Sequence, residues 1–358
     1  MIYKYEELNR FNESIFRKMG YSEDEARIAS EILLASETRG IKSHGLLRLK
    51  EYVNLWKTNR LNPNPKFKVI NETLSTALVD GDKALGLITA PKAMDLCIEK
   101  AKNAGTGWVA VRNSYHFGIA GYYAMKALDH DMIGIAMTNA NPLVAPTFSK
   151  KPLLGTNPIA IAIPSGKQTP FIADFATAPI NRGKLDMLHA IGEQAPDGLI
   201  QDKQGNPTVK ANILSDGGAI LTLGGPTIKG GHKGYCMSAS VDILTAVLSG
   251  ANFGPTVVPT LGYLKMAEGM VDKGIGHFFG AIRIDAFQTA EEFKEQMDEW
   301  ITTFRNAPPV DGEDKVLIPG DPEREYEAKC KNEGIPLTEA TIKVVKELSE
   351  NLNIDMIK

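Results

Sequence analysis

The sequence predicts an α/β protein in which helices cover the faces of a central sheet. Three observations support this. Both ends of the chain carry helical patterns, the middle carries short Val- and Ile-rich runs, and further helical patterns lie between those runs. With 358 residues, 43% of them hydrophobic, the chain can bury one large core or a few smaller ones.

The first predicted element is a helix near the N-terminus. Ser22 and Glu25 have the spacing of a capping box, which marks a helix start. Gly40 marks the region where the helix ends. Apolar residues recur at helical spacing between these points: Ala26, Ala29, Leu33 and Leu34.

The middle of the chain is expected to form buried strands. Gly107–Val111, Ile133–Thr138 and Pro158–Pro164 are short apolar runs bounded by Gly, Asn and Pro. Helical patterns over Ala90–Ala104 and Ala120–Asp129 alternate with them. This alternation predicts a sheet whose faces are covered by helices.

The C-terminal part is again expected to be helical. Thr289 and Glu292 have capping-box spacing and open an apolar run, and Thr338 is expected to cap a last helix. Between them, the proline-containing stretch Asp311–Glu327 predicts an extended segment on the surface. The apolar residues of the two helices are Phe293, Met297, Trp300, Ile301 and Phe304, and then Ile342, Val345 and Leu348.

Composition argues against several classes of function. With 40 basic and 43 acidic residues the net charge is −3, so no basic field attracts nucleic acid or an anionic membrane. We see neither a secretory leader nor an apolar stretch of about 18 residues, and therefore expect a cytoplasmic protein. Cys97, Cys236 and Cys330 are too far apart to indicate a disulfide framework or a zinc site. A small polar ligand, and no metal, is the expectation.

Two of the six histidines lie in polar stretches bounded by glycine. His116 follows a predicted strand and precedes a predicted helix, which is where ligands bind in open α/β sheets. Its imidazole can transfer a proton near pH 7, or it can simply cap the helix. His44 follows Ser43, and Arg48 nearby offers a planar fork for a carboxylate, unless this segment is a solvated helix start.

Two further segments can contact a ligand. Asp174 ends a predicted strand among small residues, where it can accept hydrogen bonds from ribose hydroxyls, orient a histidine or only form a turn. The glycine-rich loop Gly230–Tyr235, before an apolar helix over Met237–Leu248, brings bare backbone and Lys233 close to a phosphate, or is a plain turn. No GxGxxG, GxxxxGK[ST] or HExxH motif is present, so a dinucleotide would not bind in the Rossmann manner. His130, His189 and His277 receive no role.

Taken in order, six segments resemble the malate/L-lactate/L-sulfolactate dehydrogenase family, often called the type 2 malate/lactate dehydrogenases. They are Ser43-His44-Gly45 with Arg48, Asn113–Gly121, Gly155–Ala160, Asp174–Ala178, Lys233–Tyr235 and Pro319–Glu323. The resemblance implies a non-Rossmann fold and a homodimer. It also implies that residues 76–285 form an α/β domain that binds NAD(P) and substrate, beside a helical domain made of residues 1–75 and 286–358.

The resemblance also implies site residues. His116 and His44, with Ser43 beside it, are the two candidates for proton transfer, and Arg48 would hold the substrate carboxylate. The implied cofactor contacts are Asp174, Ala176, Lys233, Gly234, Gly320, Asp321 and Pro322, followed by Thr138 and Asn157. Four positions depart from the family's frequent residues: Thr222, Cys236, Met237 and Asp321.

The expected reaction is hydride transfer between NAD(P) and C2 of a small 2-hydroxy or 2-oxo acid. Malate with oxaloacetate is the first expectation for the substrate, and NAD precedes NADP. The alternatives are a reductase of a cyclic imino acid or an enzyme for lactate or sulfolactate. A hydrolase using a His/Asp pair has no GxSxG elbow to support it, and a catalytically silent dinucleotide-binding protein is a further alternative.

Overall fold

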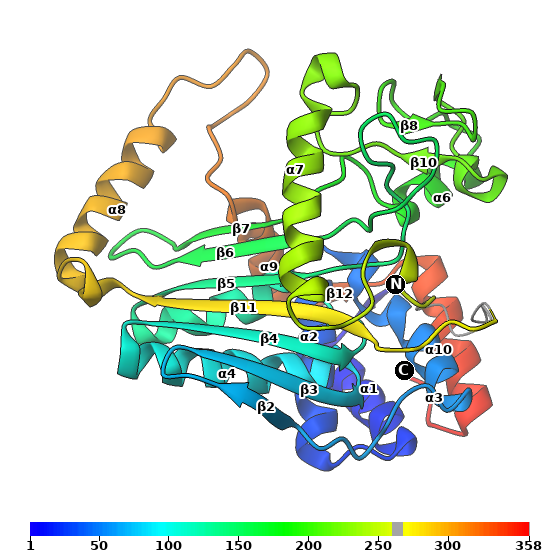
Figure 1. Ribbon diagram of the computed structural model, residues 1–358, viewed down its shortest axis with the longest axis horizontal. Helices are drawn as coiled ribbons and strands as arrows, with labels where there is room; N and C mark the ends of the chain where they lie inside the picture. The colour runs from blue at the N-terminus through cyan, green and yellow to red at the C-terminus, as the bar shows by residue number, and fades with distance from the viewer. Residues whose placement is uncertain (260–267, 358) are drawn as a thin grey trace.

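The computed structural model describes residues 1–259 and 268–357, and a seven-stranded sheet lies at its centre (Figure 1). Only β3 and β4 are parallel, and every other neighbouring pair is antiparallel. In spatial order the strands are β2 (Lys68–Glu72), β3 (Thr76–Ala84), β4 (Thr106–Ser114), β11 (Ile275–Arg283), β5 (Met132–Thr138), β6 (Ile159–Ile163) and β7 (Phe171–Phe175).

Helix α4 (Gly86–Ala104) connects the parallel pair and packs on one face of the sheet. A parallel connection needs such a crossover, since a tight turn can join only antiparallel strands. The two faces follow the alternation along a strand. Val109 and Phe279 point into the core below, whereas Trp108 and Phe278 stack on the opposite face at 5.5 Å between ring centroids.

Both chain ends build a helical layer beside the sheet (Figure 1). It contains α1 (Tyr5–Met19), α2 (Glu23–Thr38), α3 (Leu49–Lys57), α9 (Asp321–Glu333) and α10 (Glu339–Leu352). The short strands β1 (Ile2–Tyr3) and β12 (Ile335–Pro336) pair and join the two ends. One continuous core runs from this layer into the sheet. The boundary proposed at residue 75 falls between β2 and β3, and the two-domain division stays a prediction.

The predicted helix starts are confirmed. Ser22 caps α2 and forms the expected box with Glu25. Thr289 and Thr338 accept backbone N–H bonds at the starts of α8 (Ala290–Arg305) and α10. The three predicted strands are β4, β5 and β6, and the second inner helix is α5 (Ala120–Met125), which continues as a 3-10 turn to His130.

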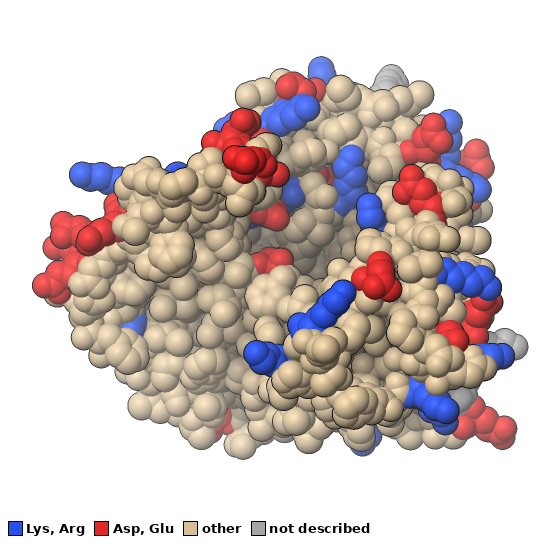
Figure 2. Space-filling model, turned by 90° about the horizontal axis from the view of Figure 1, so that it is seen from above, with Lys and Arg blue, Asp and Glu red and all other residues tan. Residues whose placement is uncertain are grey.

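A small lobe was not predicted from the sequence. It has its own apolar core, which includes Leu185, Ile200 and Ile220. Its elements are α6 (Arg182–Ala190), β8 (Ile200–Gln201), β9 (Pro207–Thr208) and β10 (Ala219–Ile220). Helix α7 (Gly231–Asp242), extended by a π-helical turn over Ile243–Val247, runs beside this lobe and reaches the sheet (Figure 1). Seen from the lobe side, the surface is hollowed, with charged side chains around the hollow (Figure 2).

Two local predictions were wrong in part. The segment Asp311–Glu327 is irregular only as far as Gly320, because α9 begins at Asp321. Pro322 lies in the first turn of that helix, where its missing N–H costs nothing. The glycine-rich stretch is likewise not a separate loop, since α7 already begins at Gly231.

None of the helices in the described ranges has both the length and the apolar character needed to cross a membrane.

Candidate active site

The two candidate histidines lie against each other. His44 ends a 3-10 turn after α2, and His116 lies in the turn between β4 and α5. Their rings are stacked, with centroids 5.3 Å apart and planes inclined by 25°. Both side chains are half-buried and so retain access from the surface. Two segments that are far apart in the sequence thus present a pair of imidazoles to one place.

Arg48 is held beside this pair by its own segment. Its Nε donates to the Ser43 carbonyl at 2.7 Å, and its Nη1 donates to both carboxylate oxygens of Glu51 at 2.8 Å. Its Nη2 has no hydrogen-bond partner among residues 1–259 and 268–357. A fixed guanidinium with one free edge is suited to an incoming carboxylate.

Three contacts define the imidazole environment. Ser43 Oγ lies 2.9 Å from Nδ1 of His44. On the other ring, Nδ1 of His116 lies 2.7 Å from the Tyr52 hydroxyl and accepts the Gly118 N–H at 3.2 Å. Glu51 and Tyr52 were not predicted from the sequence. Their spacing of three and four residues after Arg48 was the available signal, because such residues share one helix face.

Both histidines are neutral at pH 7. Burial, and then the charge of Arg48, lowers the pKa of His44 to about 3. Burial, Arg48 and the neighbouring histidines hold the pKa of His116 well below its usual 6.5. Since Arg48 contributes to both shifts, a bound anion that offsets its charge makes either ring easier to protonate.

His277, to which no role was assigned, packs against the residue that follows His116. It is fully buried, and its ring nitrogens lie 2.8 Å from Thr138 Oγ1 and 2.9 Å from Ser114 Oγ. The ring stacks on Phe117 with centroids 4.8 Å apart. His277 is therefore a core histidine with both ring nitrogens bonded, adjoining the turn that carries His116, and it engages the hydroxyl of Thr138, a predicted cofactor contact.

A pocket of about 380 Å³ is lined in part by the two segments that carry the histidines. Asp174, Gly320 and Pro322 line it, together with Ile41 and Gly121, which are neighbours in sequence of His44 and His116. The Gly121 N–H donates to Asp174 Oδ2 at 2.7 Å. Burial raises the pKa of Asp174 to about 6, although Gly121 and Arg39 act to lower it.

This pocket fits part of a dinucleotide. Its volume is typical of a small-ligand site. A Cβ at Gly121 would lie 2.8 Å from Asp174 Oδ2, and one at Gly320 would lie 2.7 Å from the Arg324 guanidinium. Glycine at both positions therefore lets these side chains approach the backbone that lines the pocket. Asp174 offers a carboxylate that can accept bonds from ribose hydroxyls. Ala176 is half-buried just beyond it, after the end of β7.

The other predicted cofactor residues are dispersed. Asp321 is nearly buried and bonded to Arg305, Arg324 and the Ile318 N–H. Asn157 is fully buried and joins the Ala140 N–H to Ser238. The polar atoms of both side chains are thus already hydrogen-bonded to other residues of the chain.

On α7, Lys233 is exposed, and Gly234 packs where a Cβ would lie 2.0 Å from the Leu223 carbonyl. Gly234 therefore serves close packing of the helix. In the part of the chain that the structure describes, no group of three or more His, Cys, Asp or Glu residues could hold a metal ion.

Comparison with known proteins places these features in context. A sequence model of the malate/L-lactate dehydrogenase family matches residues 3–346. Malate dehydrogenase of Pyrococcus abyssi is 40% identical over 98% of this chain and 94% of that protein. L-sulfolactate dehydrogenase of Methanocaldococcus jannaschii is 38% identical over 99% and 98%. The solved structure of malate dehydrogenase from Pyrococcus horikoshii superposes with a TM-score of 0.90 at 37% identity, covering 99% and 97% of the two chains.

Proposed function

Since the chain belongs to the malate/L-lactate dehydrogenase family, we propose that it transfers a hydride between NAD and C2 of malate or oxaloacetate. The resemblance drawn from the six segments is confirmed, and the chain is an NAD(P)-dependent hydroxy acid dehydrogenase. The observation that carries the proposed chemistry is the stacked pair His44 and His116 beside Arg48, whose two segments also supply Ile41 and Gly121 to the Asp174 pocket. The choice of malate is supported by the relative from Pyrococcus abyssi.

Arg48 binds the substrate carboxylate in this proposal. Its Nη2 is available, while Glu51 and the Ser43 carbonyl hold the rest of the guanidinium still. A substrate held at its carboxylate presents one face of C2, which makes hydride transfer stereospecific. The nicotinamide, when bound, supplies or accepts that hydride.

His116 carries the proton in this proposal. The bound carboxylate offsets the Arg48 charge, so the imidazole can hold a proton and release it to the carbonyl oxygen during reduction. In the oxidation of the hydroxy acid, the same ring accepts that proton. His44, stacked on it and bonded to Ser43, is the alternative proton carrier.

Asp174, Ala176, Gly320 and Pro322 hold the cofactor in this proposal, and Lys233 and Gly234 border its phosphates. NAD is preferred over NADP. Two carboxylates, Asp174 and Glu323, line the pocket, whereas its cation Arg39 is already paired with Glu327 at 2.9 Å. A carboxylate accepts bonds from a 2′-hydroxyl but repels a 2′-phosphate.

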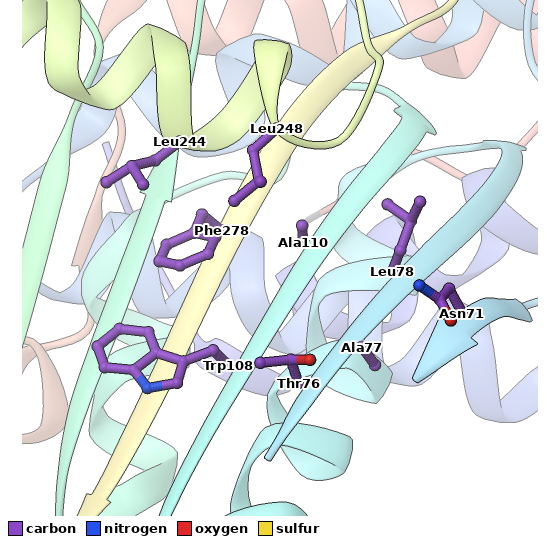
Figure 3. A pocket seen from close by; sticks show the side chains of 9 residues that line it. All are labelled: Asn71, Thr76, Ala77, Leu78, Trp108, Ala110, Leu244, Leu248 and Phe278. Carbon is purple, nitrogen blue, oxygen red and sulfur yellow. The ribbon is translucent and has the colours of Figure 1, made fainter. Parts of the chain in front are cut away.

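The enzyme is further proposed to be a cytoplasmic homodimer. Its three cysteines are free, as is usual in a reducing compartment. For the dimer, the sheet face opposite α4 has an apolar hollow of about 650 Å³, into which Trp108, Phe278, Leu244 and Leu248 project (Figure 3). Beside it Ile243 and Val247 are 54% and 55% exposed. Exposed apolar surface of this kind is typical of protein interfaces.

The test is turnover by the purified protein. Oxidation of NADH and of NADPH is followed with oxaloacetate, pyruvate, sulfopyruvate and piperideine-2-carboxylate, each offered alone. We expect oxaloacetate with NADH to give the highest kcat/KM, and His116→Ala to lose most of that activity while the exposed control His189→Ala keeps it. Preference for the imino acid identifies a reductase, and silence on all four acids despite cofactor binding refutes the proposed function.

A further inference from the structure

The segment that carries His44 and Arg48 has no side-chain cap of its own. Two short 3-10 turns, Lys42–His44 and Leu46–Arg48, meet at Gly45. Gly45 stands at the start of the second turn, where a capping side chain would accept an unpaired backbone N–H, and glycine has no side chain to do so. Because the hydrogen bonds of a 3-10 turn have poorer geometry than those of an α-helix, this turn needs an external partner to hold Arg48 in place.

Glu37 supplies the missing cap. It lies in the last turn of α2, nine residues before Leu46, and its side chain is fully buried. Its Oε1 accepts the Leu46 N–H, the first of the second 3-10 turn, at 2.8 Å. A buried N–H without an acceptor is costly, so this bond ties the turn to the end of α2.

The backbone at Gly45 makes room for the same carboxyl group. A Cβ at this position would lie 2.2 Å from Oε1 of Glu37 and 2.6 Å from its Cδ, closer than any side chain can approach. The φ of Gly45 is −93°, so its backbone conformation does not require glycine. The close approach of the Glu37 carboxyl group does. Packing and a hydrogen bond thus fix Gly45 and Leu46, the two residues that follow His44.

The Glu37 carboxyl group is not part of an ion pair. Among the described residues no salt bridge joins it, and its Oε2 accepts no hydrogen bond. Burying such a group lowers the stability of a protein, and groups that break the rules of burial in this way are concentrated at functional sites. A role in ordering the active site accounts for an acid at this place.

We propose that Glu37 is a positioning residue whose carboxyl group caps the turn Leu46–Arg48 and thereby fixes Arg48 relative to His44. The inference rests on the proposed function, in which Arg48 binds the substrate carboxylate, and extends it to a buried side chain that acts through Arg48. Without the cap, the turn loosens and the guanidinium is displaced. A displacement of about 1 Å at a substrate-binding group can reduce turnover roughly 100-fold.

The first test removes the acceptor and keeps the volume. In Glu37→Met we expect KM for oxaloacetate to rise and kcat to fall, each roughly tenfold, with KM for NADH within a factor of about two. Glu37→Gln, whose amide oxygen can still accept the Leu46 N–H, should restore both constants. The matched control is Ser30→Ala, which removes another buried hydrogen bond of α2, to Asn9 Oδ1 at 2.7 Å, and should leave both constants unchanged.

Three results of this test would overturn the inference. Unaltered constants in Glu37→Met would show that the cap does not matter to the reaction. An equal loss in Glu37→Gln would show that the acceptor is not what Glu37 contributes. An equal loss in Ser30→Ala would show that any weakening of α2 has the same effect.

The second test requires no turnover. Hydrogen exchange of the Leu46 amide is followed by ¹⁵N NMR, with the Arg39 amide, bonded to the Ala35 carbonyl at 3.1 Å, as internal reference. Relative to Arg39, Leu46 should exchange at least roughly tenfold faster in Glu37→Met than in the wild type, and at the wild-type rate in Glu37→Gln. An unchanged Leu46 rate in Glu37→Met refutes the role of Glu37. Silence on every acid refutes the proposed function instead, so the two failures are distinguishable.

Discussion

At the scale of single residues, Glu37 is a buried acid that contacts the segment carrying His44 and Arg48. It is fully buried in the last turn of α2, and its Oε1 accepts the Leu46 N–H at 2.8 Å. Within the described ranges its Oε2 has no hydrogen-bond partner. Burial raises its pKa from 4.5 to about 7, although the Leu46 N–H and Lys42 act to lower it, and Cys330 is a further titratable neighbour.

This raised pKa predicts how stability depends on pH. The folded state binds the Glu37 proton more tightly than the unfolded state, so the associated stability is fully present below pH 4.5 and is lost as pH rises through about 7. Glu37→Gln removes the titration. Above pH 7 we expect it to be more stable than the wild type by up to about 3 kcal/mol, a difference that shrinks at lower pH. Urea unfolding at several pH values measures this, with exposed Glu193→Gln as control.

Arg48 predicts a separate effect on substrate binding. Lysine in its place keeps the charge but not the planar fork that Glu51 and the Ser43 carbonyl orient. We expect Arg48→Lys to raise KM for the 2-oxo acid roughly 10- to 100-fold, while KM for NADH stays within a factor of about two. Steady-state kinetics with each substrate varied in turn measures this. A parallel rise in both constants would argue that Arg48 does not bind the acid.

Asp174 predicts the cofactor preference and its pH dependence. Its carboxylate favours a ribose hydroxyl over a phosphate, so Asp174→Asn should reduce the NADH over NADPH preference roughly tenfold. In the wild type the preference should also weaken as pH falls through about 6, where the carboxylate becomes protonated. The ratio of kcat/KM for the two cofactors across pH measures both effects. A preference that is independent of pH and of this substitution would place the 2′ position elsewhere.

At the scale of elements, Asp321 connects three parts of the chain. Its carboxylate receives bonds from Arg305 of α8, from Arg324 of α9 and from the Ile318 N–H. Although burial acts to raise the pKa of Asp321, these donors together lower it. The start of α9, and with it the pocket wall at Gly320 and Pro322, depends on this one side chain.

Asp321→Asn is therefore expected to lower the free energy of unfolding by about 1 to 3 kcal/mol and to raise KM for NADH. Because the lowered pKa stabilises the fold only while the acid is ionised, the wild-type advantage should vanish as pH falls below 3.8 and the native carboxyl becomes protonated. Denaturant unfolding and steady-state kinetics test this, with exposed Asp314→Asn as control. An unchanged KM for NADH would mean that the wall does not touch the cofactor.

At the scale of the whole molecule, the apolar hollow on the sheet predicts the assembly. Leu248 is 58% exposed at the edge of this hollow. An arginine there would place an unpaired charge in the centre of the proposed interface. We expect Leu248→Arg to shift the protein from dimer to monomer in light scattering, whereas Met187→Arg, 45% exposed on α6, should stay dimeric. A dimer in both variants would place the interface on another face.

Local patterns in the sequence determined most of the individual elements. The capping box at Ser22, the N-cap at Thr289 and apolar runs such as Ile133–Thr138 depend on neighbouring residues and can therefore be recognised from the sequence. The chemical types at His44, Arg48 and His116, in one order with the other segments, were sufficient to identify the family. Local reading was wrong where a proline starts a helix, as at Pro322.

Only the tertiary structure decided which of these residues meet. The stacking of His44 on His116, the Tyr52 bond to His116 and the place of His277 between Ser114 and Thr138 all join positions distant in sequence. The tertiary structure likewise decided that β11 lies between β4 and β5. It also decided that Phe304 on α8, one of the apolar residues of its helix, remains nearly half-exposed. These contacts arise from strand pairing and from burial of surfaces against each other. Such packing depends on which elements become neighbours, and no short stretch of sequence encodes it.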